Sequence, residues 1–242
     1  MNRVDWSWHS PTLDRVVHLT RWGHYGKPIL FFPTAGGDHE DPERWKMIYA
    51  LRPLLEAGRV KIYGCGQVNR EGWMSLDHTP TQKSAIHARF DAMLVNEMLP
   101  RIAEDCDGHR TLGCVGASLG AYNAVNAAAK HPDWFDLAIG MSGYYDPEPF
   151  MNGERNLDHY YNNPMCFLPN LGECEQLTLL RRARFVIAYG RGRWESPDQS
   201  NRMARVLAAR DIPVNLEVWG PDADHDWPTW RTMLPTFLNR LV

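Results

Sequence analysis

The sequence lacks any apolar stretch of the about 20 residues that a membrane-spanning helix needs. Its first ten residues carry Asp5, two tryptophans and His9 in place of the apolar core of a secretory signal. No linker rich in Ser, Gly and Pro and no block of like charge divides the 242 residues. We therefore expect one domain over residues 1–242, with no membrane span and no export.

An excess of charge of one sign is also missing. The 26 Lys and Arg residues nearly balance the 29 Asp and Glu residues, so the formal net charge is only −3, and the basic residues are scattered along the chain. A nucleic-acid-binding surface needs such residues gathered in one place. We therefore expect no nucleic-acid partner.

Cysteine is sparse, and the number of cysteines is odd. The five cysteines lack the spacing of metal ligands, and some fall inside apparent strands, as buried free thiols do. We expect free thiols, no metal site and a reducing compartment such as the cytoplasm. The residues concerned are Cys65, Cys106, Cys114, Cys166 and Cys174.

Short apolar runs alternate with helical stretches along the chain. The predicted strands are Arg15–Leu19, Pro28–Phe32, Val60–Cys65, Thr111–Val115, Leu137–Met141, Phe185–Tyr189 and Val214–Trp219. The predicted helices are Glu43–Glu56, Gln82–Glu104, Ala121–Lys130, Gln199–Arg210 and Trp227–Leu241. This alternation predicts an α/β fold with a mostly parallel central sheet flanked by helices.

Two features modify the alternation. Pro53 and Pro100 should kink or shorten the first two helices. Residues 142–182 combine aromatic residues with Pro, Asn and Gly, and we expect them to form an excursion over the top of the sheet. The aromatic side chains there could line a substrate pocket or simply cover the sheet. They are Tyr144, Tyr145, Phe150, Tyr160, Tyr161 and Phe167.

The segment Gly116-Ala117-Ser118-Leu119-Gly120 lies directly between a predicted strand and a predicted helix. A serine on such a turn projects its hydroxyl clear of the sheet, and glycines two residues away on either side let the backbone bend sharply. The five-residue pattern alone also fits a glycine-rich helix start. Its position between a strand and a helix favours Ser118 as a nucleophile.

A serine nucleophile needs a general base, and in strand-turn-helix hydrolases the chain order is Ser, acid, His. His225 follows the last predicted strand and precedes the last helix, which is where that base belongs. The alternative role is a histidine in an acidic loop at a helix entry. Among the other histidines, His39 could line the site. We expect helix-flanking or surface positions for His78, His87, His109 and His131.

The orienting acid should follow the strand Phe185–Tyr189, where Glu195 and Asp198 both qualify. Ser196 and Pro197 form a typical helix start, so Asp198 would serve the helix N-terminus, whereas Glu195 stays free in the loop. We favour Glu195 and leave Asp198 as the alternative, and either could be a solvated loop charge. Three aspartates near the base are expected to be solvated or capping: Asp222, Asp224 and Asp226.

A tetrahedral oxyanion needs backbone N–H donors. Leu119, the residue after the nucleophile, should supply one of them. The loop after the strand Pro28–Phe32 reads Pro33-Thr34-Ala35-Gly36-Gly37-Asp38 and should supply the second, from Gly36 or Ala35. A plain turn would explain the same glycines.

With these residues in place, the chain resembles the "putative esterase" family of α/β-hydrolases, which includes the esterase D group and the mycobacterial mycolyltransferases. The resemblance spans nearly the whole chain. It is carried by four segments: Phe32–Gly37 with Trp45 beyond it, Gly116–Gly120, Glu195–Asp198 and His225–Pro228.

The resemblance implies an α/β-hydrolase with Ser118 as nucleophile, His225 as base and Glu195 as acid, acting on a small-molecule ester without a metal or organic cofactor. Ala117 and Leu119 depart from the esterase D group, which tends to carry His and Met there, and this argues against a glutathione-thioester substrate. An acyltransferase with the same triad and a non-catalytic binding protein on this fold are the alternatives.

Overall fold

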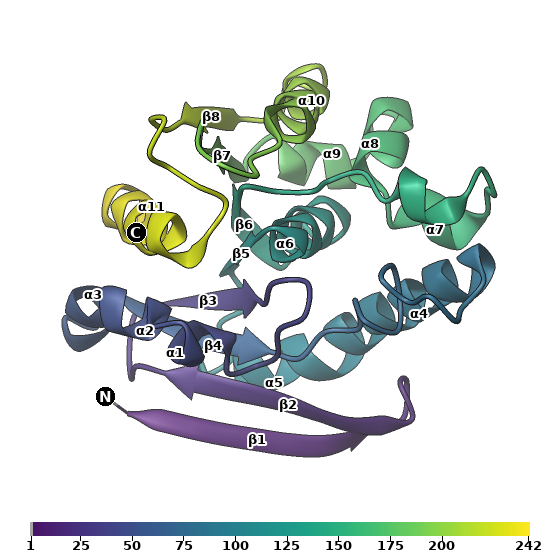
Figure 1. Ribbon diagram of the computed structural model, residues 1–242. Helices are drawn as coiled ribbons and strands as arrows, with labels where there is room; N and C mark the ends of the chain where they lie inside the picture. Colours follow the sequence, from purple (N-terminus) through teal and green to yellow (C-terminus); the bar gives the residue numbers. More distant parts are fainter. Residues whose placement is uncertain (1) are drawn as a thin grey trace.

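The computed structural model describes residues 2–242 and contains an eight-stranded sheet (Figure 1). The strands are β1 Arg3–Ser10, β2 Arg15–Trp22, β3 Lys27–Phe32, β4 Val60–Cys65, β5 Leu112–Ala117, β6 Phe135–Met141, β7 Arg184–Tyr189 and β8 Val214–Val218. Their order across the sheet is β1-β2-β4-β3-β5-β6-β7-β8. The pairs β1–β2 and β2–β4 are antiparallel and all other pairs are parallel, which confirms the predicted mostly parallel sheet.

Helices cover both faces of the sheet (Figure 1). The α-helices are α1 Asp41–Arg44, α2 Met47–Ala50, α3 Arg52–Glu56, α4 Pro80–Met93, α5 Leu99–Glu104, α6 Leu119–Lys130, α7 Leu157–Tyr161, α8 Pro164–Phe167, α9 Glu175–Leu180, α10 Pro197–Ala208 and α11 Trp227–Leu241. On one face α2, α3 and α11 bury their apolar side chains, and on the other α4, α5, α6, α9 and α10 do so. Each face therefore has its own hydrophobic core, as a parallel sheet requires.

Strand β1 was not among the predicted strands. Its sequence alternates strictly, with Val4, Trp6 and Trp8 half-buried between exposed neighbours, and Trp6 and Trp8 pack against the core. A period of two is the signal of a half-buried edge strand. A search for continuous apolar runs passes over it.

The prediction of a single helix over residues 43–56 is wrong, because the segment forms three short helices. Lys46 breaks it with a left-handed backbone (φ 62°), and Pro53 lies in the first turn of α3. Residues 80–104 are also interrupted, by a π-helical turn at Leu94–Met98, after which Pro100 lies in the first turn of α5. Proline has no N–H to donate and is tolerated in a first helical turn, and both predicted helices are shorter than the stretches assigned to them.

Residues 142–182 connect β6 to β7 through short elements rather than one covering helix. Besides α7, α8 and α9 they include the 3₁₀ turns η2 Glu148–Met151 and η3 Leu168–Asn170. Tyr145 and Phe167 are buried, whereas Tyr161 is exposed. Helix α7 packs against α4, so the connection spreads over the outer helical layer (Figure 1).

The expectation that His87 lies at a helix flank or on the surface is wrong. His87 is buried inside α4 and stacks on the indole of Trp73, with ring centroids 4.4 Å apart. Its Nε2 accepts the backbone N–H of Trp73 at 3.5 Å.

Among residues 2–242, no helix combines the length and the apolar character that crossing a membrane would take.

Candidate active site

Ser118 lies on the tight turn between β5 and α6, with a strained backbone (φ 57°, ψ −126°). Two glycines make the turn possible. A Cβ on Gly116 would lie 2.2 Å from the carbonyl oxygen of Gly120, and one on Gly120 would lie 2.4 Å from the carbonyl oxygen of Phe32. Only glycine fits at both positions, so the sequence motif fixes the serine on the turn between β5 and α6.

The backbone of Ser118 is tied to the end of β6. Its N–H donates to the carbonyl of Met141 at 3.0 Å, and its own carbonyl accepts the N–H of Tyr144 at 3.4 Å. The N–H of Leu119, at the start of α6, has no acceptor among residues 2–242. This amide is thus free to donate to a substrate group bound next to Ser118.

Glu195 lies in the loop between β7 and α10, and its side chain is 1% exposed. Its Oε1 accepts the hydroxyl of Ser142 at 2.6 Å, and its Oε2 lies 3.9 Å from Nδ1 of His225. The same Ser142 hydroxyl accepts the indole N–H of Trp230 at 2.9 Å. A serine and a tryptophan from two other elements therefore hold the buried carboxyl group facing His225.

His225 lies between β8 and α11, and its side chain is 26% exposed. Its backbone N–H donates to the carbonyl of Arg193 at 3.0 Å, and its ring meets that of Trp230 edge to face at 5.2 Å. Asp226 caps α11 by accepting the N–H of Trp227 at 2.7 Å, which fixes the end of the His225 loop. The structure brings Glu195 and His225 together, and no side-chain hydrogen bond joins His225 to Ser118 within residues 2–242.

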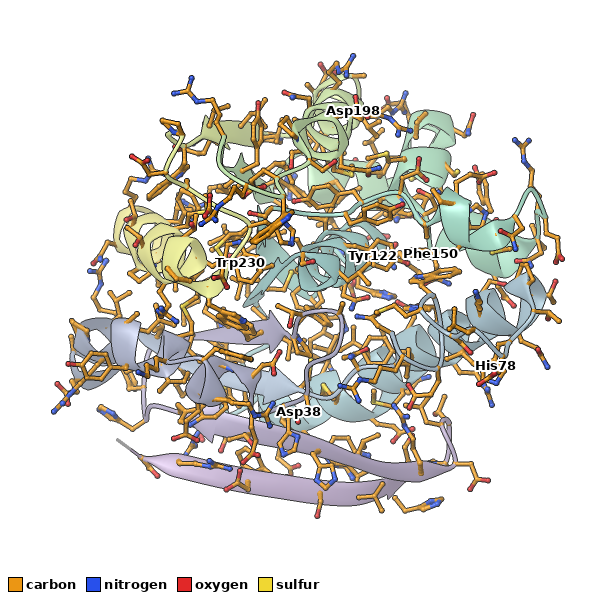
Figure 2. The ribbon with its side chains drawn as sticks, viewed as in Figure 1. Asp38, His78, Tyr122, Phe150, Asp198 and Trp230 are labelled. Carbon is orange, nitrogen blue, oxygen red and sulfur yellow. The ribbon has the colours of Figure 1, made fainter. Side chains whose placement is uncertain are left out.

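Two other acids near this arrangement pair with arginine residues instead of with His225. Asp198 is in the first turn of α10, 72% exposed and 3.9 Å from Arg202, and it lies away from Trp230 (Figure 2). The sequence predicted a solvated or capping role for Asp224. Its side chain is 26% exposed, and its hydrogen bonds go to Arg193. It accepts the backbone N–H of Arg193 at 2.7 Å and pairs with the guanidinium of the same residue at 3.0 Å, joining the two loops that carry Glu195 and His225.

Comparison with known proteins identifies the family of the chain. The family model described as "Putative esterase" matches residues 63–241. The chain belongs to this esterase family. The esterase has the α/β-hydrolase fold, and its family cleaves carboxylic esters.

Solved structures of similar fold cover almost all of the esterase. A ferulic acid esterase is 17% identical with a TM-score of 0.73, over 100% of this chain and 98% of that one. An S-formylglutathione hydrolase from Agrobacterium tumefaciens is 14% identical with a TM-score of 0.75, over 98% and 93%. MPT51 from Mycobacterium tuberculosis is 16% identical with a TM-score of 0.67, over 100% and 98%. A comparison with curated protein sequences finds no match.

Burial sets the protonation of the two facing groups of the esterase. It lowers the pKa of His225, which Asp226 raises in part. It raises the pKa of Glu195, against the hydrogen bond from Ser142, which lowers it. Both shifts favour the uncharged forms, so His225 is a neutral imidazole at neutral pH, the form that can accept a proton.

The loop that should supply the second oxyanion donor lies directly after β3. The N–H groups of Ala35 and Gly36 have no acceptor among residues 2–242, whereas the N–H of Gly37 donates to Thr34 at 3.0 Å. The histidine expected near this loop, His39, stacks on His18 with ring centroids 4.8 Å apart, and burial lowers the pKa of His39. No cluster of three His, Cys, Asp or Glu side chains in the described part of the esterase could hold a metal ion.

Sequence reasoning missed Ser142 and Trp230, the residues that hold Glu195. Ser142 has a left-handed backbone (φ 50°) directly after β6, and Trp230 lies one turn into α11. Ser142 ends a strand next to β5, and serines at strand ends of a parallel sheet are a usable signal. The tryptophan gives no comparable signal, because its role appears only when α11 is docked.

Proposed function

We propose that Ser118 is the nucleophile of the esterase, His225 its general base and Glu195 the acid that orients the base. The observation that carries this assignment is the buried carboxyl group of Glu195, 3.9 Å from Nδ1 of His225. Among the described residues, His225 is the only basic side chain that faces this buried carboxyl group. The strained turn at Ser118 supports the nucleophile, because strain of that kind concentrates at functional sites.

Each step of the reaction moves one proton. Nε2 of His225 takes the Ser118 hydroxyl proton while Oγ attacks the ester carbonyl carbon, giving a tetrahedral oxyanion and an imidazolium that the Glu195 carboxylate stabilises. The C–O bond to the alcohol breaks, and the imidazolium proton goes to the departing alcohol oxygen. Water then attacks the acyl-enzyme with His225 as base again, releasing the carboxylic acid and restoring Ser118.

The oxyanion would lie between two backbone amides. Leu119 N–H is the first donor, and its lack of a partner in the described chain supports this role. Gly36 N–H is the proposed second donor, with Ala35 N–H as its neighbour on the same loop. Preorganised donors of this kind contribute about 10²- to 10³-fold each to turnover.

Aromatic side chains next to Ser118 could bind the acyl or alcohol group of the substrate. Tyr144 is hydrogen-bonded through its backbone to Ser118, is half-buried, and has its ring 5.7 Å from that of Phe150. Phe150 in turn stacks on Trp73 at 6.2 Å. If these aromatic side chains line the pocket, Tyr144→Ala should change the preference of the enzyme for acyl chain length. An unchanged preference would mean that they only pack against the rest of the protein.

The assignment is tested with p-nitrophenyl esters of short and medium acyl chains. Ser118→Ala and His225→Ala should abolish turnover, and Glu195→Gln should lower kcat by about 10³- to 10⁴-fold, because an amide cannot stabilise the imidazolium. Asp198→Asn, a matched loss of charge two residues past the Ser196 N-cap, should leave kcat unchanged. If Asp198→Asn cripples the enzyme and Glu195→Gln does not, the acid is Asp198.

A second readout separates a wrong residue from a wrong reaction. A fluorophosphonate should label the wild type at Ser118 and leave Ser118→Ala unlabelled. Failure of the wild type to react with every ester and with the fluorophosphonate would overturn the serine-esterase proposal. Product analysis with a competing alcohol distinguishes hydrolysis from acyl transfer.

We place the esterase in a reducing compartment, the cytoplasm. The thiols of Cys65 and Cys114 are buried within β4 and β5, and the Cys114 thiol donates to the carbonyl of Ala124 at 3.2 Å. All five cysteines are free thiols. Fractionation of the producing cells, with ester hydrolysis as the marker, tests this placement.

A further inference from the structure

Three consecutive carbonyl groups of the loop after β3 are held by two side chains from the loop after β4. Nε2 of Gln67 donates to the carbonyl oxygens of Ala35 at 3.1 Å and of Gly37 at 3.0 Å. Nη2 of Arg70 donates to the carbonyl oxygen of Gly36 between them, at 2.7 Å. The proposed oxyanion loop is therefore fixed by side chains from outside it.

The Gln67 amide can be placed in only one orientation. Its Oε1 accepts the backbone N–H of Asn69, while its Nε2 faces two carbonyl oxygens. Turning the amide by 180° would set its oxygen against both carbonyls and its nitrogen against an N–H. Asn69 is itself buried, and its Oδ1 accepts Nδ2 of Asn123 of α6 at 3.4 Å, so the same network reaches the helix that follows Ser118.

Holding a carbonyl also aims the next amide. In a trans peptide the C=O and the following N–H point in opposite directions, and the described peptide bonds are trans. Because Gln67 binds the carbonyl of Ala35, the N–H of Gly36 points away from the β4 loop. Strand β3 lies between β4 and β5, and Ser118 directly follows β5, so this amide points toward the nucleophile's side of the sheet.

The other end of the loop is anchored independently. The carboxyl group of Asp41, 1% exposed, accepts the backbone N–H of Thr34 at 3.3 Å and its hydroxyl at 3.1 Å. A Cβ on Gly37 would lie 1.7 Å from Oδ2 of the same aspartate, so the loop closes directly on this group. With Asp41 on one end and Gln67 on the other, little freedom is left to the amides between them.

We propose that Gln67 is a positioning residue that holds the amide of Gly36 in the orientation needed to bind the oxyanion; this rests on the proposed serine-esterase function. We call the two hydrogen bonds from Gln67 to Ala35 and Gly37 the clamp. Negative charge develops on the substrate oxygen only in the transition state. Loss of the clamp therefore lowers kcat and kcat/KM together and leaves KM nearly unchanged. A displacement of donors by about 1 Å can cost about 100-fold, so we expect a loss of kcat of about 10- to 100-fold.

The test compares Gln67→Ala and Gln67→Glu with Gln176→Ala. Gln176 makes the same kind of bond, from Nε2 to the carbonyl of Ala129 at 2.8 Å, at the far end of α6, so it matches the chemical change without touching the loop. Phenylboronic acid, which forms a tetrahedral adduct with an active serine, reports on the oxyanion site apart from substrate binding. Its inhibition constant should rise in step with the loss of kcat in both Gln67 variants and stay constant in Gln176→Ala.

Two results would overturn the clamp while leaving the esterase proposal intact: kcat of Gln67→Ala equal to that of Gln176→Ala, or a rise in KM alone. If Gln67→Ala does not fold, Arg70→Ala, on the exposed side of the loop, carries the same comparison with a smaller expected loss. If the wild type turns over no ester and binds no phenylboronic acid, the esterase proposal falls. The clamp is then tested by the NMR order parameters of residues 35–38. They should be lower in Gln67→Ala than in the wild type, and unchanged values would overturn the clamp.

Discussion

Ser142→Ala tests whether the proposed acid is held by its neighbours. The substitution removes the hydroxyl that donates to Glu195 at 2.6 Å and accepts the indole N–H of Trp230 at 2.9 Å. Alanine and serine have the same backbone preferences at φ 50°, so the change acts through the hydroxyl alone. Both partners are buried, and neither can turn to water.

The expected loss of stability follows from these two bonds. A hydrogen bond to a charged or polarised carboxyl group contributes about 1.5–3 kcal/mol, and a stranded buried N–H costs about 1–3 kcal/mol. The two losses overlap because Glu195 can take up a proton once its partner is gone. We therefore expect Ser142→Ala to lower the free energy of unfolding by about 2–4 kcal/mol.

The effect on catalysis has a different signature from the effect on stability. The Ser142 bond lowers the pKa of Glu195 against burial, so its loss raises that pKa further. A protonated Glu195 cannot stabilise the imidazolium of His225. We expect kcat to fall by about 10- to 100-fold and the acid limb of the kcat/KM profile to move to higher pH, a shift that loss of stability alone would not produce.

Ser200→Ala is the matched control. Ser200 is as buried as Ser142, but its hydroxyl has no partner in the described structure, so its removal should be neutral or slightly stabilising. Urea unfolding at neutral pH and p-nitrophenyl acetate turnover, measured on both variants, decide the matter. If the two variants behave alike in either assay, Ser142 does not hold the acid.

Three further predictions concern other parts of the molecule. Burial lowers the pKa of His225 below its ordinary 6.5, and only the neutral imidazole accepts a proton. The acid limb of the kcat/KM profile should therefore be centred below pH 6.5. An acid limb centred above pH 6.5 contradicts the assignment of His225 as the base. Gly120→Ala would place a Cβ 2.4 Å from the carbonyl oxygen of Phe32, so it should lower the free energy of unfolding by about 3 kcal/mol or more. Gly172→Ala, where a Cβ meets nothing within 4 Å, should leave that free energy unchanged in the same urea titration. Burial lowers the pKa of His87 from 6.5 to about 3, so between these values protons bind the unfolded chain but not the folded one, and stability declines as the pH falls. From pH 7 to pH 5 the wild type should lose about 2 kcal/mol more than His87→Gln, and equal losses would exclude this linkage.

The fold could be predicted in outline because its signals are local. Short apolar runs marked every strand of the parallel part of the sheet, and the turn at Ser118 carried its own glycines. Strand β1 was missed because an edge strand alternates instead of forming a run. The prediction of one helix over residues 43–56 failed because a non-glycine residue, Lys46, adopts a left-handed backbone there, which residue type alone does not signal.

The candidate site could be predicted only as far as its parts lie on strand ends in a fixed chain order. Ser142 meets Glu195 across 53 residues of sequence and Trp230 across 88, and no local pattern connects them. Gln67 meets Ala35 across 32 residues and reads in the sequence as an ordinary loop residue. Such residues become visible only when the strands that carry them are set side by side.

The order of the sheet explains why the supporting residues are where they are. Strands β5, β6, β7 and β8 are neighbours in the sheet as well as in the chain, and the loops after them carry Ser118, Ser142, Glu195 and His225 in turn. On the other side of β5, β3 and β4 are also neighbours in the sheet and in the chain. There Gln67, in the loop after β4, donates hydrogen bonds to the proposed oxyanion loop after β3. In each case a group proposed to act in the reaction is held by a side chain from an adjacent loop. Placement then depends on strand spacing, which backbone hydrogen bonds fix, and much less on the stiffness of any single loop.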